Sequence, residues 1–177
     1  MRRLIAATLL LLAACAHRMP PAAIALPPLR LAPAALGGEL AAQQRLQFRF
    51  GAQQRELDAL LEVDAGEVRL AVQAMGQSGV RLQWDGKQLH EQRAPWLPAA
   101  VRSERVLDDL QFSLWPIEAI RAALPPGWSV EDDGRERRLV HEGEAWLRVT
   151  RLADRLQLVN RAEGYQLDIQ TLGGDMP

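Results

Sequence analysis

The chain contains few of the residues on which disulfides, metal sites and nucleic-acid binding depend. Its 177 residues include one cysteine, three histidines, and 21 basic against 22 acidic residues. A single cysteine excludes an internal disulfide, so packing must hold the fold together. The balanced charge argues against nucleic acid as a partner. The histidines, His17, His90 and His141, lack the spacing of metal ligands, so we expect no metal and no other cofactor.

A hydrophobic run long enough to cross a membrane is also missing. The run from Leu4 to Leu12 falls well short of the ~20 apolar residues that a spanning helix needs. It follows Arg2-Arg3 and precedes small residues, which is the order of regions in a secretory signal. We therefore expect residues 1–14 to be a signal peptide that is removed.

The end of this run, Leu12-Ala13-Ala14-Cys15, resembles the bacterial lipobox. In that motif the cysteine thiol is diacylated, the signal is cut before the cysteine, and the new amino group is acylated. The resemblance implies lipidation of Cys15 and attachment to the membrane through N-terminal acyl chains. An ordinary signal followed by an unrelated cysteine is the alternative. Ala16 stands where an aspartate would retain a lipoprotein at the inner membrane, so the expected location is the outer membrane, on its periplasmic face.

Residues 15–40 are rich in proline and end close to Gly37-Gly38. This composition predicts an extended tether in partly polyproline conformation. The tether also holds several apolar residues, which indicate that part of it lies against the domain that follows. These residues are Ile24, Leu26, Leu29, Leu31 and Leu36. We expect residues 41–177 to form a single domain.

From Gln43 onward, apolar and polar residues alternate over short stretches separated by turn residues. Leu46 and Phe48 show the alternation, and Asp85-Gly86 is a strong hairpin signal. Strict alternation predicts an antiparallel sheet with one apolar face. After the first strand, the expected strands cover 57–63, 68–74, 80–84, 87–91, 128–131, 136–141, 145–151, 155–160 and 165–171. A loop is expected over 75–79.

Two short helices interrupt these strands midway. Ser103 can cap a helix that runs through Leu110, with Asp108-Asp109 at its end. Pro116 suits the first turn of a second helix, which Pro125-Pro126-Gly127 terminates. The expected fold class is therefore mainly β (α+β), with about nine to eleven antiparallel strands and two inserted helices.

This order of elements resembles LolB, the outer-membrane receptor that accepts lipoproteins from the periplasmic carrier LolA. Besides strand order, the resemblance rests on residues 70–82 with Asp85-Gly86-Lys87, and on the stretches 112–117 and 122–127. It implies a strongly curved, incomplete barrel in which the helices form a lid over an apolar cavity. It also implies a LolA-like carrier as a partner and a lipid or lipoprotein as the ligand.

The chain is still more similar to an uncharacterised family of short lipoproteins. The likeness lies in the Pro/Leu-rich tether, in Asp109-Leu110 followed by Trp115-Pro116, and in the last strand with Tyr165. Members of that family are often encoded beside genes of aryl-polyene lipid biosynthesis. The resemblance implies a role in handling lipid or lipoprotein.

An apolar set on the expected strands and loops would bind the ligand. Its members are Phe48, Phe50, Leu61, Leu70, Val72, Leu82, Trp84, Trp96, Trp115, Leu147, Val149, Leu158 and Leu167. The alternative is that these residues form a filled core, with Trp96 and Trp115 as plugs instead of gates. Met75 corresponds to the apolar tip of a loop that enters the membrane in the LolB family, although an ordinary hairpin loop is the alternative.

These observations predict a non-catalytic, monomeric outer-membrane lipoprotein. It would bind an amphiphile, either lipoprotein acyl chains or a lipid-like product, for transport or insertion at the outer membrane. One alternative is an envelope interaction or scaffold module with a filled core. Another is a periplasmic lipid hydrolase, although no serine lies in a Gly-x-Ser-x-Gly elbow and no catalytic residue is assigned.

Overall fold

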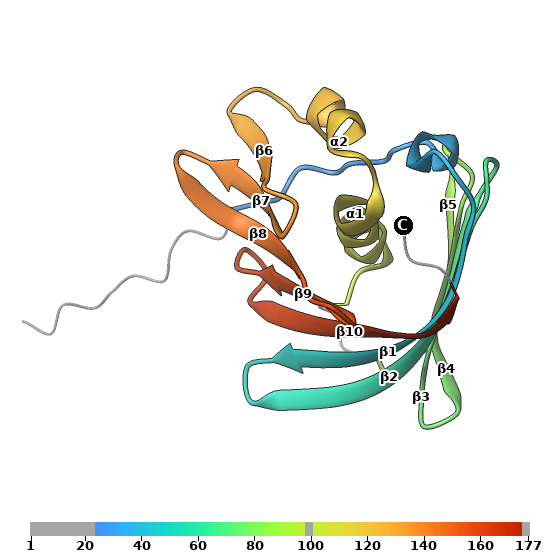
Figure 1. The fold of residues 1–177 in the computed structure, drawn as a ribbon. Coiled ribbons are helices and arrows are strands. Elements are labelled where there is room, and N and C mark those ends of the chain that lie inside the picture. The colour runs from blue at the N-terminus through green and yellow to red at the C-terminus, as the bar shows by residue number, and fades with distance from the viewer. Residues whose placement is uncertain (1–23, 98–100, 175–177) are drawn as a thin grey trace, which may run out of the picture.

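The computed structural model describes residues 24–97 and 101–174, and its main element is one ten-stranded antiparallel sheet (Figure 1). The expected signal peptide and Cys15 lie outside these residues. In chain order the strands are β1 (Leu40–Phe50), β2 (Gln53–Val63), β3 (Val68–Ala74), β4 (Gln77–Trp84), β5 (Leu89–Arg93), β6 (Trp128–Asp132), β7 (Glu136–His141), β8 (Glu144–Arg151), β9 (Arg155–Asn160) and β10 (Tyr165–Gly174). The expected mainly β fold, a curved incomplete barrel with short helices, is confirmed.

The sheet consists of two meanders joined through the first and last strands. Within β1–β5 and within β6–β10, each strand pairs with the next one in the chain. β1 also pairs with β10, where Leu46 lies opposite Ile169. β5 and β6 therefore form the two edges of the sheet. The helices inserted between those edges, α1 (Ser103–Leu114) and α2 (Ile117–Ala123), complete the fold. Figure 1 shows α1 inside the curve of the sheet.

Several expected boundaries differ from the structure, and two of them concern the site. The loop expected over 75–79 is a tight turn, because Met75 and Gly76 both adopt positive φ (48° and 75°), which lets β4 begin at Gln77. The first helix does not end at Leu110 but continues to Leu114. It ends there because Pro116 disfavours helical geometry at Trp115, whose φ and ψ are −70° and 152°.

The main core lies between the concave face of the sheet and α1. Leu107 and Phe112 on α1, together with Trp115 just after it, are fully buried. Leu61 of β2 and Leu147 of β8 are fully buried in the same cluster, although they come from opposite halves of the sheet. α1 therefore packs against both meanders.

Residues 24–36, which we call the strap, run across α1 before the chain enters β1 (Figure 1). The strap ends in the 3-10 helix η1 (Pro33–Leu36). Leu29 and Leu31 are only 6% and 8% exposed and belong to the core cluster. This part of the expected tether thus packs into the domain.

Among the described helices, none has the length and apolar character that crossing a membrane would require.

Candidate functional site

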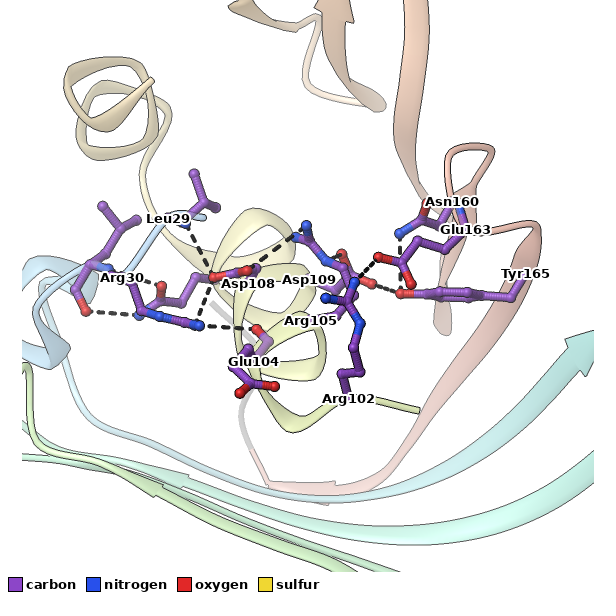
Figure 2. Close-up of polar contacts among 12 residues, drawn as sticks. Leu29, Arg30, Arg102, Glu104, Arg105, Asp108, Asp109, Asn160, Glu163 and Tyr165 are labelled. Atoms are coloured by element: carbon purple, nitrogen blue, oxygen red, sulfur yellow. Dashed lines mark hydrogen bonds and ion pairs between the residues drawn. The ribbon is translucent and has the colours of Figure 1, made fainter. Parts of the chain in front are cut away.

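The candidate site is formed by α1, and its polar contacts extend in two directions (Figure 2). Asp108 and Asp109 are adjacent on the helix and both are buried. Asp108 points toward the strap, and Asp109 points toward Tyr165 of β10 (Figure 2). Because the helix continues beyond them to Leu114, the interpretation of these aspartates as a helix end was wrong.

On the strap side, α1 binds the backbone of residues 29–31. The Leu29 N–H donates to Asp108 Oδ1 at 3.1 Å, and the Arg30 guanidinium donates to the same oxygen at 2.9 Å. Gln111 accepts from the Leu31 N–H at 2.9 Å and donates to the Leu31 carbonyl at 2.8 Å. Burial raises the pKa of Asp108, although the positive charges of Arg105 and Arg30 oppose this effect.

On the sheet side, Asp109 lies in a buried polar cluster. The Tyr165 hydroxyl donates to Asp109 Oδ2, and Asn160 donates to that hydroxyl at 3.2 Å. Arg105 Nε lies 2.9 Å from Asp109 Oδ1, an ion pair without the alignment of a hydrogen bond. Burial raises the pKa of Asp109 to about 6, against the opposing effects of Arg105 and Tyr165. The Ser103 hydroxyl is also buried, and it has no hydrogen-bond partner among residues 24–97 and 101–174.

The C-terminal end of α1 is held by Arg137 of β7. Its Nη1 donates to the carbonyls of Phe112 and Trp115, each at 2.7 Å. Its Nε donates to Asp132 Oδ2 at 2.6 Å. Partial burial favours a raised pKa at Asp132, but hydrogen bonds from Arg151 and Arg137 outweigh it and lower the pKa to about 2. A cation thus satisfies carbonyls that the helix end leaves unpaired.

The structure brings most of the expected ligand-binding residues together beneath α1. The buried members are Leu61, Leu70, Leu82, Trp84, Trp115, Leu147, Val149 and Leu158. Phe48, Val72 and Leu167 are half-buried, and the Phe48 ring lies 5.5 Å from the Tyr165 ring between centroids. Phe50 and Trp96 are 41% and 44% exposed and do not belong to the core cluster.

In this structure the side chains of α1 and the strap cover the concave face. One hollow in the described residues is lined from β2 to β5, mostly by polar or exposed side chains such as Leu60, Arg69 and Arg81. Leu70 and Leu82 also line it, and they are the members of the expected ligand-binding set that do so. Met75, at the tip of the β3–β4 hairpin, is 93% exposed.

Sequence reasoning missed the polar residues of α1 and the arginine that holds its end. Arg105 stands three and four residues before Asp108 and Asp109, the spacing of ion pairs on one helix face. This signal was available in the sequence. The contacts of α1 with Leu29, Leu31 and Arg137 could not be recognised in the sequence, because they join segments that are distant along the chain.

We expect the buried Asp109 to make stability depend on pH. Its folded-state pKa of about 6 lies above the ordinary value of 3.8, so folding favours the protonated form. The free energy of unfolding should therefore gain about 1 kcal/mol from this group as the pH falls from 7 to 5. Urea titrations across that range should show this gain in the wild type and not in Asp109→Asn.

The matched control for this pH dependence is Asp85→Asn. Hydrogen bonds from the Gln88 and Lys87 N–H groups lower the pKa of Asp85, so this carboxyl is ionised throughout the range tested. Its replacement should lower stability without changing the slope between pH 5 and 7. Equal slopes in the wild type and Asp109→Asn would contradict the raised pKa.

Comparison with known proteins assigns the folded region to a family without assigning an activity. A family model described as a protein of unknown function (DUF3261) matches residues 41–173. No curated protein matches the chain. The matched region contains α1, α2 and all but the outermost residues of the sheet. The strap lies before it.

Proposed function

The chain belongs to this family of proteins of unknown function, DUF3261, and from that premise we propose that it binds an amphiphile on the concave face of its sheet. The protein would be an outer-membrane lipoprotein anchored at Cys15, and it would pass the ligand to or from that membrane. The ligand class is lipoprotein acyl chains or a lipid-like product, in line with the resemblances to LolB and to the lipoproteins encoded beside aryl-polyene genes. A LolA-like carrier would be the donor.

One observation carries this proposal: the helix that covers the apolar face is held partly by buried polar contacts, in addition to the apolar contacts of Leu107 and Phe112. Asp108, Asp109 and Gln111 of α1 bind the strap and Tyr165, and all three are buried. Such bonds are exchanged for bonds to water when the helix moves away, so each contributes only about 1 kcal/mol net. Acyl chains that replaced the helix would gain about 0.8 kcal/mol for each buried methylene. Acyl chains can therefore offset the polar contacts of α1, provided that they also replace the apolar contacts that Leu107 and Phe112 make with the sheet.

The transfer needs no covalent step. A passive protein moves a ligand according to its relative affinity for carrier, receptor and bilayer, because binding only shifts populations. Among the described residues, the buried Ser103 hydroxyl has no hydrogen-bonded base that would activate it. We therefore favour a binding role over hydrolysis.

The second candidate function is an envelope docking module. The observation in its favour is that Leu61, Leu147 and Val149, expected to contact a ligand, are fully buried against neighbouring side chains. A permanently filled core of this kind would leave the outer surface as the working part of the protein. The two candidates differ in whether α1 ever leaves the concave face.

Loosening α1 separates these candidates. Tyr165→Phe keeps the ring but removes the hydroxyl that binds Asp109, so it should raise the affinity for a dansylated fatty acid several-fold. Leu70→Trp adds bulk to the concave face and should lower that affinity. Val63→Ala, which removes buried methyl groups from β2, is the control for lost stability alone. If neither the wild type nor Tyr165→Phe takes up the probe, the core is permanently filled and the lipid-binding proposal fails.

Met75 offers a separate test of contact with the membrane. Its side chain is exposed at a hairpin tip, and we propose that it enters the periplasmic leaflet of the outer membrane. Burying one such side chain is worth about 1.5–3 kcal/mol, so Met75→Glu should weaken binding of the Cys15→Ala protein to phospholipid vesicles about tenfold or more.

The control for Met75 is Leu152→Glu, which places the same charge on another exposed apolar residue. It should leave vesicle binding close to that of the Cys15→Ala protein, and Met75→Leu should retain it. If Met75→Glu leaves vesicle binding of the Cys15→Ala protein unchanged, the insertion proposal fails and the β3–β4 turn is an ordinary hairpin turn.

A further inference from the structure

The strap is bound through its backbone by four side chains of the domain: Trp84, Asp108, Gln111 and Trp115. We call these the strap-binding residues. Leu31 receives the most contacts, because the Trp84 indole donates to its carbonyl at 2.7 Å in addition to the two bonds from Gln111. The Trp115 indole donates to the Ala32 carbonyl at 3.0 Å. Backbone groups of this kind are present in almost any extended peptide.

We propose that the strap-binding residues form a recognition site for extended peptides. In this structure the strap of the same chain occupies the site. The linker that follows the acylated cysteine of another lipoprotein would replace the strap there. This inference rests on the proposed function, since it specifies the ligand as an acylated peptide. The acyl chains would lie on the concave face, and the linker would lie where the strap now lies.

The side chains of the strap show which peptides the site favours. Leu29 and Leu31 are buried anchors on either side of Arg30. The Arg30 guanidinium pairs with Asp108, donates to the Glu104 carbonyl at 3.2 Å, and lies 5.9 Å from the centre of the Trp84 ring. The site therefore fits an apolar–basic–apolar sequence. The backbone hydrogen bonds tolerate many sequences, and these three side-chain positions supply the specificity.

Two observations indicate that the strap can be exchanged. Arg30 has a φ of 47°, a left-handed conformation that costs a non-glycine residue free energy. Gly37 and Gly38 connect the strap to β1, and no neighbouring side chain or backbone among the described residues packs against them, so this joint can adopt other backbone conformations once the Gly37 N–H releases the Ala34 carbonyl.

The position of the strap in the chain indicates the kind of peptide that replaces it. The strap follows Cys15, the residue that the sequence identifies as the site of acylation. The site thus already holds a peptide from a lipoprotein linker. An incoming lipoprotein presents the same combination of acyl chains and extended linker, and both parts would find a place beside α1.

The experiment uses the full chain with its strap weakened in place. Leu29→Ser with Leu31→Ser removes both anchors, so a fluorescent peptide of residues 24–36 should bind this variant at least ten times more tightly than it binds the wild type. Methylation of the peptide nitrogen of Leu31 should abolish the gain, because Gln111 then loses its donor. Methylation at Ala34, which none of these bonds uses, should not. Equal affinity for both proteins, or indifference to methylation at Leu31, would overturn the inference.

A second measurement needs no variant that might fail to fold. An exchangeable strap must open without global unfolding, so the Leu29 and Leu31 amides should exchange hydrogen at least a hundred times faster than that of Leu46 in β1. Exchange at the rate of the sheet would refute the inference. Fatty-acid uptake is read in the same samples: peptide binding without uptake would contradict the lipid-binding function, while uptake without peptide binding would contradict only the strap site.

Discussion

Replacing Arg137 with alanine should lower the free energy of unfolding by about 3–5 kcal/mol, the usual cost of removing one partner from a buried ion pair. The guanidinium is buried and binds two carbonyls at the end of α1 as well as the Asp132 carboxylate. Alanine would leave those carbonyls without their donor in a dry environment. We therefore expect the substitution to destabilise both α1 and the domain as a whole. Urea unfolding monitored by tryptophan fluorescence measures this loss of unfolding free energy.

The control is Arg138→Ala, one residue along the same strand. Arg138 is 42% exposed and pairs with Glu131 at 3.0 Å and Glu136 at 3.6 Å. Exposed ion pairs contribute little, so this change should cost less than about 1 kcal/mol. Equal losses for the two arginines would show that Arg137 does not hold the helix end.

The pH dependence of the same ion pair has a defined sign. The pKa of Asp132 is lowered to about 2 from an ordinary 3.8. Its contribution to stability is therefore present above pH 4 and is lost as the pH falls toward 2. In Arg137→Ala this acid-dependent loss should shrink, although Arg151 still pairs with Asp132 at 3.0 Å.

The sheet could be predicted from the sequence because its signals are local. Alternation of apolar and polar residues identified each strand, and pairs such as Asp85-Gly86 marked the turns between them. The boundaries were less accurate where the turn was short, as at Met75-Gly76. Pairing of β1 with β10 was not visible locally, since these strands lie at opposite ends of the domain.

The site was harder to predict because α1 buries polar residues. Asp108, Asp109 and Gln111 interrupt the apolar pattern of the helix, so the predicted helix ended at Leu110, four residues too early. Their burial is stable only because distant groups bind them, including Leu29, which is 79 residues from Asp108 in the chain. Such partners follow from the tertiary fold, and a single sequence does not reveal them.

Replacing Trp115 with alanine should cost about 3–5 kcal/mol, as for other fully buried large side chains. Trp115 has no exposed surface, and its indole also donates to the Ala32 carbonyl. Trp96→Ala is the matched control: this ring is 44% exposed and lies against Gly79, so we expect a loss below about 1.5 kcal/mol. Chemical unfolding of the two variants under the same conditions makes the comparison.

The same pair of variants distinguishes a plug from a gate. A plug fills space, so Trp115→Ala should leave an apolar cavity beneath the strap, and such cavities accept small apolar molecules. The variant should then bind the fatty-acid probe more tightly than the wild type does, despite its lower stability. Trp115→Phe keeps most of the volume but loses the indole donor, and it should cost about 1 kcal/mol without that gain in affinity. If Trp96→Ala changes probe uptake and Trp115→Ala does not, the ligand enters beside the exposed tryptophan and Trp115 has only a structural role.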